Sequence, residues 1–220
     1  MFIHLMEQIK HCFVEYDNAP QGRIHEAEVM VYPPDRDVVA IFDVSGSTGN
    51  TDWPPTRLDG GKEAVRKLHS ELLQSSPDAR IGIVAFSNRA SIVCPLISVR
   101  DSNGFHSSLT SMKSGGGTCI YSGIKGALEM LASSSSTAQV ILVSDGLDDW
   151  HNPRELARNL KAKAVIDCVG IGGSPRAVDE PLLKDIASFN RDGSKRYRWI
   201  GEPQHLVDHF EKLAGRICES

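Results

Sequence analysis

Most of the chain alternates between short apolar runs and segments in which apolar residues recur every three or four positions. The runs that predict strands are Val38–Phe42, Arg80–Phe86, Ser91–Leu96, Gln139–Val143, Ala164–Ile171 and Arg196–Ile200. The segments that predict helices are Leu58–Leu72, Ile120–Leu131 and three stretches beginning at Pro153, Pro181 and Pro203, since proline suits a first helical turn. Strands that alternate with helices predict an α/β domain with a central, mostly parallel sheet and helices on both faces.

Two neighbouring segments depart from this alternation. Arg80–Phe86 and Ser91–Leu96 are separated by only four residues, so they are expected to form an antiparallel hairpin. Ser98–Gly117 is rich in serine and glycine, which predicts a loop with at most a short helical piece.

Residues 1–35 stand apart from the rest and are interpreted as an extension ahead of a domain spanning residues 36–220. Apolar residues in its first half have helical spacing, and Ala27–Tyr32 is suited to an added strand. The composition is that of a folded protein, since 40% of the 220 residues are hydrophobic and 24% are charged.

Charge and cysteine content narrow the class of partner and compartment. A formal net charge of −4 provides no overall basic field, so neither nucleic acid nor an anionic membrane surface is expected as a partner. No apolar run reaches the roughly 18 residues of a membrane-spanning helix. Five irregularly spaced cysteines suggest reduced thiols, and Met1–Tyr16 lacks the features of a secretory leader. A cytoplasmic protein is therefore expected.

Oxygen-bearing side chains occur at three places where strands end or helices begin. Asp43, Ser45 and Ser47 directly follow the first strand, Thr118 follows three glycines before a helix, and Asp145 follows the strand ending at Val143. Carboxyl ends of parallel strands share one edge of a sheet, which predicts that these donors converge there. Oxygen ligands of this kind suit a hard divalent cation such as Mg²⁺. Singly, each residue is also typical of an ordinary turn or helix cap.

Together these residues resemble the von Willebrand factor type A domain and its metal-ion-dependent adhesion site. That motif consists of Asp-x-Ser-x-Ser, a distant Thr and a distant Asp, and Asp43, Ser45, Ser47, Thr118 and Asp145 match all five positions. The resemblance extends from about residue 37 to residue 218. It implies a Rossmann-like three-layer α/β fold, in which a mostly parallel six-stranded sheet has one antiparallel edge strand.

The resemblance also implies a role for each residue. Ser45 and Ser47 would directly bind the cation, which is expected to be Mg²⁺ or alternatively Mn²⁺ or Ca²⁺. Asp43 and Asp145 would bind it mostly through water. Thr118 would bind it either directly or through water. Neutral hydroxyl ligands leave positive charge on the cation, which then attracts a carboxylate from another protein. The expected function is a cation-dependent adaptor, and the family suggests partners in ATPase, chelatase, kinase or phosphatase systems.

Two other functions use the same cation. A metal-dependent hydrolase would need a base such as His151 or Asp149 within reach of a metal-bound water. A purely structural metal would stabilise the loops without affecting any partner. No nucleophile is paired with a base in the motif, so neither catalysis nor a catalytic residue is expected.

Four residues are candidates for a partner-contacting rim around the metal edge: Trp53, Asp148, Asp149 and Trp150. Exposed aromatic side chains often anchor partners. The alternative is that both tryptophans simply cover the loops, and that the two aspartates form a solvated acidic turn.

Three further features have an ordinary interpretation beside a functional one. Cys119 at a helix start is either a thiol of lowered pKa or a small buried side chain. His205 and His209 lie four apart, but without a third ligand they are expected on a helix surface. Arg191 and residues 195–199 form a basic and aromatic cluster that is compatible with nucleic-acid contact. The strict alternation from Arg196 to Trp199 instead favours an edge strand, with aromatic residues facing inward and arginines that discourage edge-to-edge association.

Overall fold

A computed structural model describes residues 36–134, 138–145 and 151–219 of the protein. The chain divides between Tyr32 and Pro33, and the fold below belongs to the larger unit. The helix and strand expected in residues 1–35 lie outside the described residues.

Six strands form one sheet in the order β3-β2-β1-β4-β5-β6. Every neighbouring pair is parallel except β2 and β3, which form the expected antiparallel hairpin at one edge. The strands are β1 (Asp37–Asp43), β2 (Arg80–Phe86), β3 (Ala90–Ser98), β4 (Ala138–Ser144), β5 (Ala164–Ile171) and β6 (Tyr197–Ile200). The predicted α/β class, with its mostly parallel six-stranded sheet, is confirmed.

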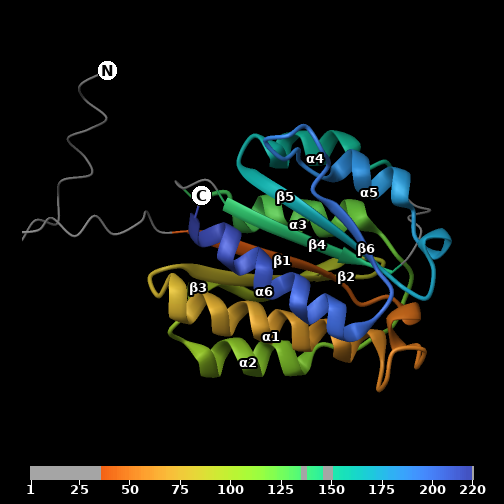
Figure 1. Ribbon diagram of the computed structural model, residues 1–220, viewed down its shortest axis with the longest axis horizontal. Coiled ribbons are helices and arrows are strands. Elements are labelled where there is room, and N and C mark those ends of the chain that lie inside the picture. Colours follow the sequence, from red (N-terminus) through yellow and green to blue (C-terminus); the bar gives the residue numbers. More distant parts are fainter. Residues whose placement is uncertain (1–35, 135–137, 146–150, 220) are drawn as a thin grey trace, which may run out of the picture. The chain divides into compact units, whose positions relative to one another are not determined.

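Helices cover both faces of this sheet and complete three layers (Figure 1). One face carries α1 (Arg57–Ser75), α2 (Ser102–Ser111) and α6 (Pro203–Glu219). The other face carries α3 (Ile120–Met130), α4 (Arg154–Lys161) and α5 (Glu180–Ile186).

The central strand β1 is buried along its whole length because both of its faces are covered. Val38, Ala40 and Phe42 pack toward α1 and α6, whereas Val39 and Ile41 pack toward α3. Successive side chains of β1 point to opposite faces, and both faces are buried, so every position from Val38 to Phe42 is apolar in the sequence.

Helix α2 corrects the expectation that residues 98–117 form a loop with at most a short helical piece, because the helix is ten residues long. The Asp101 carboxylate caps it by accepting a hydrogen bond from Gly104 N–H at 3.1 Å. Phe105 and Leu109, four residues apart, are fully buried and anchor it to the sheet. Serines around these two residues obscured the helical periodicity.

Strand β6 lies at the second edge of the sheet, as the alternation of its residues predicts. Tyr197 and Trp199 pack against the face covered by α3, α4 and α5, whereas Arg198 is exposed. The edge-strand interpretation of this cluster is confirmed, and Arg196 and Arg198 consequently face the side of the sheet that carries α6.

Candidate metal centre

The predicted oxygen donors converge where β1 and β4 end. These strands are parallel neighbours, with Phe42 opposite Val143. Asp43 is the last residue of β1, and Asp145 directly follows the last residue of β4. The sheet therefore places two carboxylates side by side, although about a hundred residues separate them in sequence.

Backbone hydrogen bonds hold the loop containing Thr118 against the loop that follows β1. Gly46 N–H donates to Gly116 O at 2.9 Å, and Gly115 N–H donates to Val44 O at 2.8 Å. Gly116 has φ of +84°, a conformation that side-chain-bearing residues rarely adopt. The glycines before Thr118 therefore permit the close approach of the two loops.

Four of the five motif residues form one hydrogen-bonded network. Ser47 Oγ donates to Asp145 Oδ1 at 2.8 Å, and the hydroxyls of Ser45 and Ser47 are 3.0 Å apart. Asp43 accepts bonds from Ser45 N–H at 2.8 Å and from the Ser144 hydroxyl at 2.7 Å. These contacts fix the orientation of both carboxylates.

Thr118 lies in the adjoining loop and is half-buried. Among the described residues it makes no hydrogen bond to the other four. Helix α3 begins at Ile120 with Cys119 as its N-cap, so Thr118 precedes the cap instead of occupying it. Cys119 is only 3% exposed, which fits the interpretation as a small buried side chain.

Burial leaves the two carboxylates in an electrostatically unfavourable arrangement. Asp43 is 1% exposed and Asp145 is 3% exposed. Burial, followed by repulsion from Asp145, raises the pKa of Asp43 to about 6, despite opposing hydrogen bonds from Ser45 and Ser144. A cation placed between these groups would relieve that repulsion.

Arg57 is a residue of this site that the sequence interpretation missed. It begins α1, and its guanidinium donates to Asp145 Oδ2 at 3.0 Å. The same guanidinium binds Asp52 through two hydrogen bonds of 2.9 and 2.7 Å. Asp145 is thus neutralised in part by the protein itself.

One sequence signal could have singled out Arg57. A positive charge in the first turn of a helix opposes the helix dipole. Thr56 fixes that start, since its hydroxyl accepts Asp59 N–H at 3.1 Å. An arginine directly after a helix cap is locally unfavourable, which is a weak sequence signal for an acidic partner elsewhere in the fold.

Of the four residues predicted to form a partner-contacting rim, the structure describes only Trp53. Trp53 corrects the expectation of a partner-contacting side chain, because it is 2% exposed and packs in the core against α1. Asp148, Asp149 and Trp150 lie outside the described residues. His151 is exposed, and its ring centroid lies 5.4 Å from that of Tyr121.

The donors at this edge are two carboxylates and three hydroxyls, which suit hard divalent cations. Among the described residues, His, Cys, Asp and Glu side chains do not gather in groups of three that could hold a metal. Any cation here would therefore rely on the serine and threonine oxygens. The chemistry and burial of the side chains present are compatible with Mg²⁺, Mn²⁺ or Ca²⁺.

The family model of the von Willebrand factor type A domain matches residues 38–147, half of the chain. The chain belongs to this family. The matched region includes all the residues assembled above at the carboxyl ends of β1 and β4.

Two curated proteins are similar in sequence to this chain. An uncharacterized protein of Borreliella burgdorferi is 29% identical over 187 residues, covering 81% of this chain and 52% of the relative. A UPF0353 protein of Mycolicibacterium gilvum is 26% identical over 206 residues, covering 80% of this chain and 59% of the relative. The chain thus spans only half to three-fifths of each relative.

Solved structures support the fold of the type A domain. A von Willebrand factor type A protein from Catenulispora acidiphila has a TM-score of 0.70 at 23% identity, covering 84% of this chain and 43% of that one. Proximal thread matrix protein 1 from mussel byssus, with a zinc-occupied adhesion motif, has a TM-score of 0.69 at 23% identity, covering 84% and 46%. Among the described residues, no helix is long and apolar enough to cross a bilayer.

Proposed function

We propose that Asp43, Ser45, Ser47, Thr118 and Asp145 hold a divalent cation, preferably Mg²⁺, through which the domain binds another protein. The observation that supports this proposal most directly is the pairing of two buried carboxylates with serine hydroxyls in one network. Such a pair is costly, and because Arg57 compensates only Asp145, a cation near Asp43 would offset the remaining negative charge.

The five side chains differ in how deeply they are buried, and this difference suggests a separate role for each group. Ser47 and Thr118 are half-buried and accessible, whereas Asp43, Ser45 and Asp145 lie beneath them. The hydroxyls would ligate the cation, and the carboxylates would hold the hydroxyls and bound water in place. A bound cation supplies an electrophilic position for an anionic oxygen of a partner.

The partner is expected to present an Asp or Glu side chain. Type A domains typically mediate protein–protein interaction, and among the described residues the serine hydroxyls of this edge contact carboxylates and are not hydrogen-bonded to a histidine. We therefore assign an adaptor function in preference to catalysis. An ATPase, kinase or phosphatase system is the class of assembly in which we place it.

Thermal unfolding with and without added Mg²⁺ tests the metal half of the proposal. The wild-type midpoint should rise, because a ligand of the folded state stabilises it by about 2.7 kcal/mol at a hundred-fold excess over Kd. Asp43→Ala should abolish the rise. Asp78→Ala is the matched control, since Asp78 is an exposed carboxylate paired with Arg100 ahead of β2. No wild-type response to Mg²⁺, Mn²⁺ or Ca²⁺ would contradict metal binding.

Affinity capture of partners with Ser47→Ala and with a chelator tests the binding half. Partners retained by the wild type should be lost under both treatments, and Ser111→Ala, which alters an exposed serine on α2, should retain them. Unchanged capture despite a metal-dependent midpoint would indicate a structural metal. Mg²⁺-dependent turnover that Ser45→Ala abolishes would instead indicate a hydrolase.

A further inference from the structure

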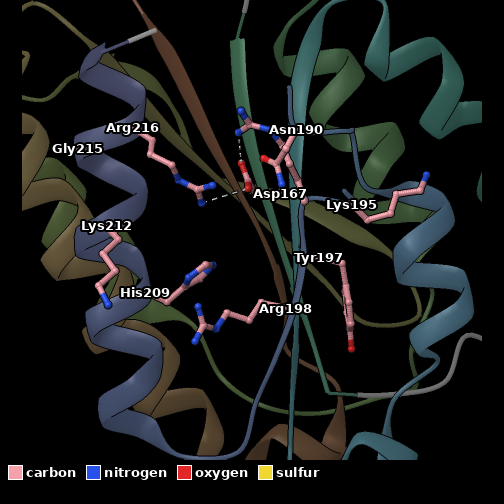
Figure 2. Close-up of a pocket in the computed structure, with 10 residues that line it drawn as sticks. Asp167, Asn190, Lys195, Tyr197, Arg198, His209, Lys212, Gly215 and Arg216 are labelled. Atoms are coloured by element: carbon pink, nitrogen blue, oxygen red, sulfur yellow. Dashed lines mark hydrogen bonds and ion pairs between the residues drawn. The ribbon is translucent and has the colours of Figure 1, made fainter. Parts of the chain in front are cut away.

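A hollow of about 490 Å³ lies between the edge strand β6 and helix α6. Figure 2 shows Arg198 of β6 reaching toward His209 of α6, with Lys212 and Arg216 on the same helix. The residues that line it are Asp167, Asn190, Lys195, Arg196, Tyr197, Arg198, His209, Lys212, Gly215 and Arg216. Its strand residues lie at the start of β6 and in the middle of β5, whereas the candidate metal site lies at the carboxyl ends of β1 and β4.

The alternation of β6 and the period of α6 together produce this lining. Because Tyr197 and Trp199 pack on the opposite face, Arg196 and Arg198 point toward α6. On α6 the lining residues His209, Lys212 and Arg216 are three and four positions apart, so they share one side of the helix. Two elements therefore direct cationic side chains into one space.

The hollow has a large excess of positive charge. Five of its lining side chains are lysine or arginine, and one, Asp167, is acidic. Asp167 accepts a hydrogen bond from Arg196 at 3.2 Å and forms an ion pair with Arg216 at 3.5 Å. Within the described ranges, Arg198 and Lys212 have no acidic partner.

This excess is local, since the whole chain has a formal charge of −4. Like charges that face one another are unfavourable and favour a bound anion. The Arg196 Nε atom is also buried without a hydrogen-bond partner in the described part of the chain. His209 is half-buried among Arg198, Lys212 and Arg216, and burial followed by these cations lowers its pKa to about 4. It is therefore neutral at pH 7 and able to accept or donate one hydrogen bond.

We propose that this hollow binds a phosphorylated small molecule, whose phosphoryl oxygens are held by Arg198, Lys212 and Arg216. Its volume is within the range of small-molecule sites, about 300–1,000 Å³. Guanidinium groups match phosphate oxygens in a planar, bidentate geometry, and lysine adds a point charge. A phosphoryl dianion offsets more of the local excess than a single carboxylate does.

Calorimetric titration of the full chain with pyrophosphate, in EDTA at constant ionic strength, tests the proposal. We expect saturable one-to-one binding, at least ten-fold tighter than that of the dicarboxylate succinate. Arg198→Ala/Lys212→Ala should weaken it at least ten-fold. Both side chains are on the surface of the fold, and far-ultraviolet circular dichroism should confirm that the variant remains folded.

The control variant is Arg66→Ala/Lys125→Ala, which removes two exposed cations outside the hollow and should bind as the wild type does. Ser47→Ala should also bind pyrophosphate normally, so failure of the metal proposal would leave this result unaffected. Absence of saturable binding, or equal weakening in the control, would overturn the proposal. Displacement of pyrophosphate by a poly-glutamate peptide or a single-stranded oligonucleotide at lower concentration would overturn it in favour of a macromolecular partner.

Discussion

At the scale of single residues, Arg57 adds positive charge to the proposed metal site at the carboxyl ends of β1 and β4. Its guanidinium contacts Asp145 and Asp52 at once and is nearly buried. It compensates one of the two buried carboxylates when no other cation is present. The same positive charge opposes the approach of a divalent ion.

Arg57→Gln should therefore lower the midpoint of thermal unfolding without metal and enlarge the increase caused by Mg²⁺. The expected gain in Mg²⁺ affinity is on the order of ten-fold, a modest part of the Coulomb repulsion at a partly buried site. Midpoints measured across a Mg²⁺ titration give both quantities. Arg66→Gln, on the exposed side of the same helix, should change neither. An unaltered Mg²⁺ response in Arg57→Gln would show that the guanidinium does not sense the cation.

At the scale of elements, the packing of α1 on β1 depends on a residue with no side chain. A Cβ atom added at Gly61 of α1 would lie 1.8 Å from the Phe42 ring of β1. Gly215 of α6 contrasts with it, because a Cβ there meets no atom within 4 Å. Both glycines lie within helices, but only Gly61 leaves no room for a side chain.

Gly61→Ala should destabilise the fold by about 2 kcal/mol or more through overpacking, since Phe42 is fully buried and cannot move aside. Gly215→Ala should stabilise it by about 0.5–1 kcal/mol, because alanine favours a helix over glycine. Urea unfolding of both variants measures the difference. A neutral Gly61→Ala would mean that α1 shifts relative to β1 at little cost.

At the scale of the whole molecule, the buried Asp43 and the half-buried His209 give opposite responses to pH. The pKa of His209 falls to about 4, below its ordinary 6.5, so its contribution to stability is lost as pH falls through this interval. The pKa of Asp43 rises to about 6, above its ordinary 3.8, so ionisation costs stability as pH rises through that interval. The two effects largely cancel between pH 4 and 6.

His209→Gln should remove the contribution of His209 to the pH dependence of stability and leave that of Asp43. Relative to the wild type, the variant should lose stability as pH rises from about 4 to 6.5, with a difference in slope of up to about 1.4 kcal/mol per pH unit. Urea unfolding at several pH values measures it. His205→Gln, four residues earlier and exposed, is the control. Parallel pH profiles of His209→Gln and the wild type would contradict the lowered pKa.

Local patterns in the sequence determine most of the fold. The burial of β1 on both faces, the alternation of β6 and the period of α1 each reflect a repeat that the backbone imposes. Helix α2 was underestimated because two apolar residues among serines give a weak periodic signal, although burial of Phe105 and Leu109 stabilises it.

The sequence by itself determined the class of fold and the oxygen donors at the ends of β1 and β4, since parallel strands deliver their carboxyl ends to one edge. Only the tertiary structure decided which charges meet. Arg57 reaches Asp145, which lies 88 positions later in the chain, and Arg198 of β6 faces His209 of α6. It also buried Trp53 in the core. Contacts between distant segments depend on how the helices and the sheet pack together, and the local spacing of apolar residues does not predict that packing.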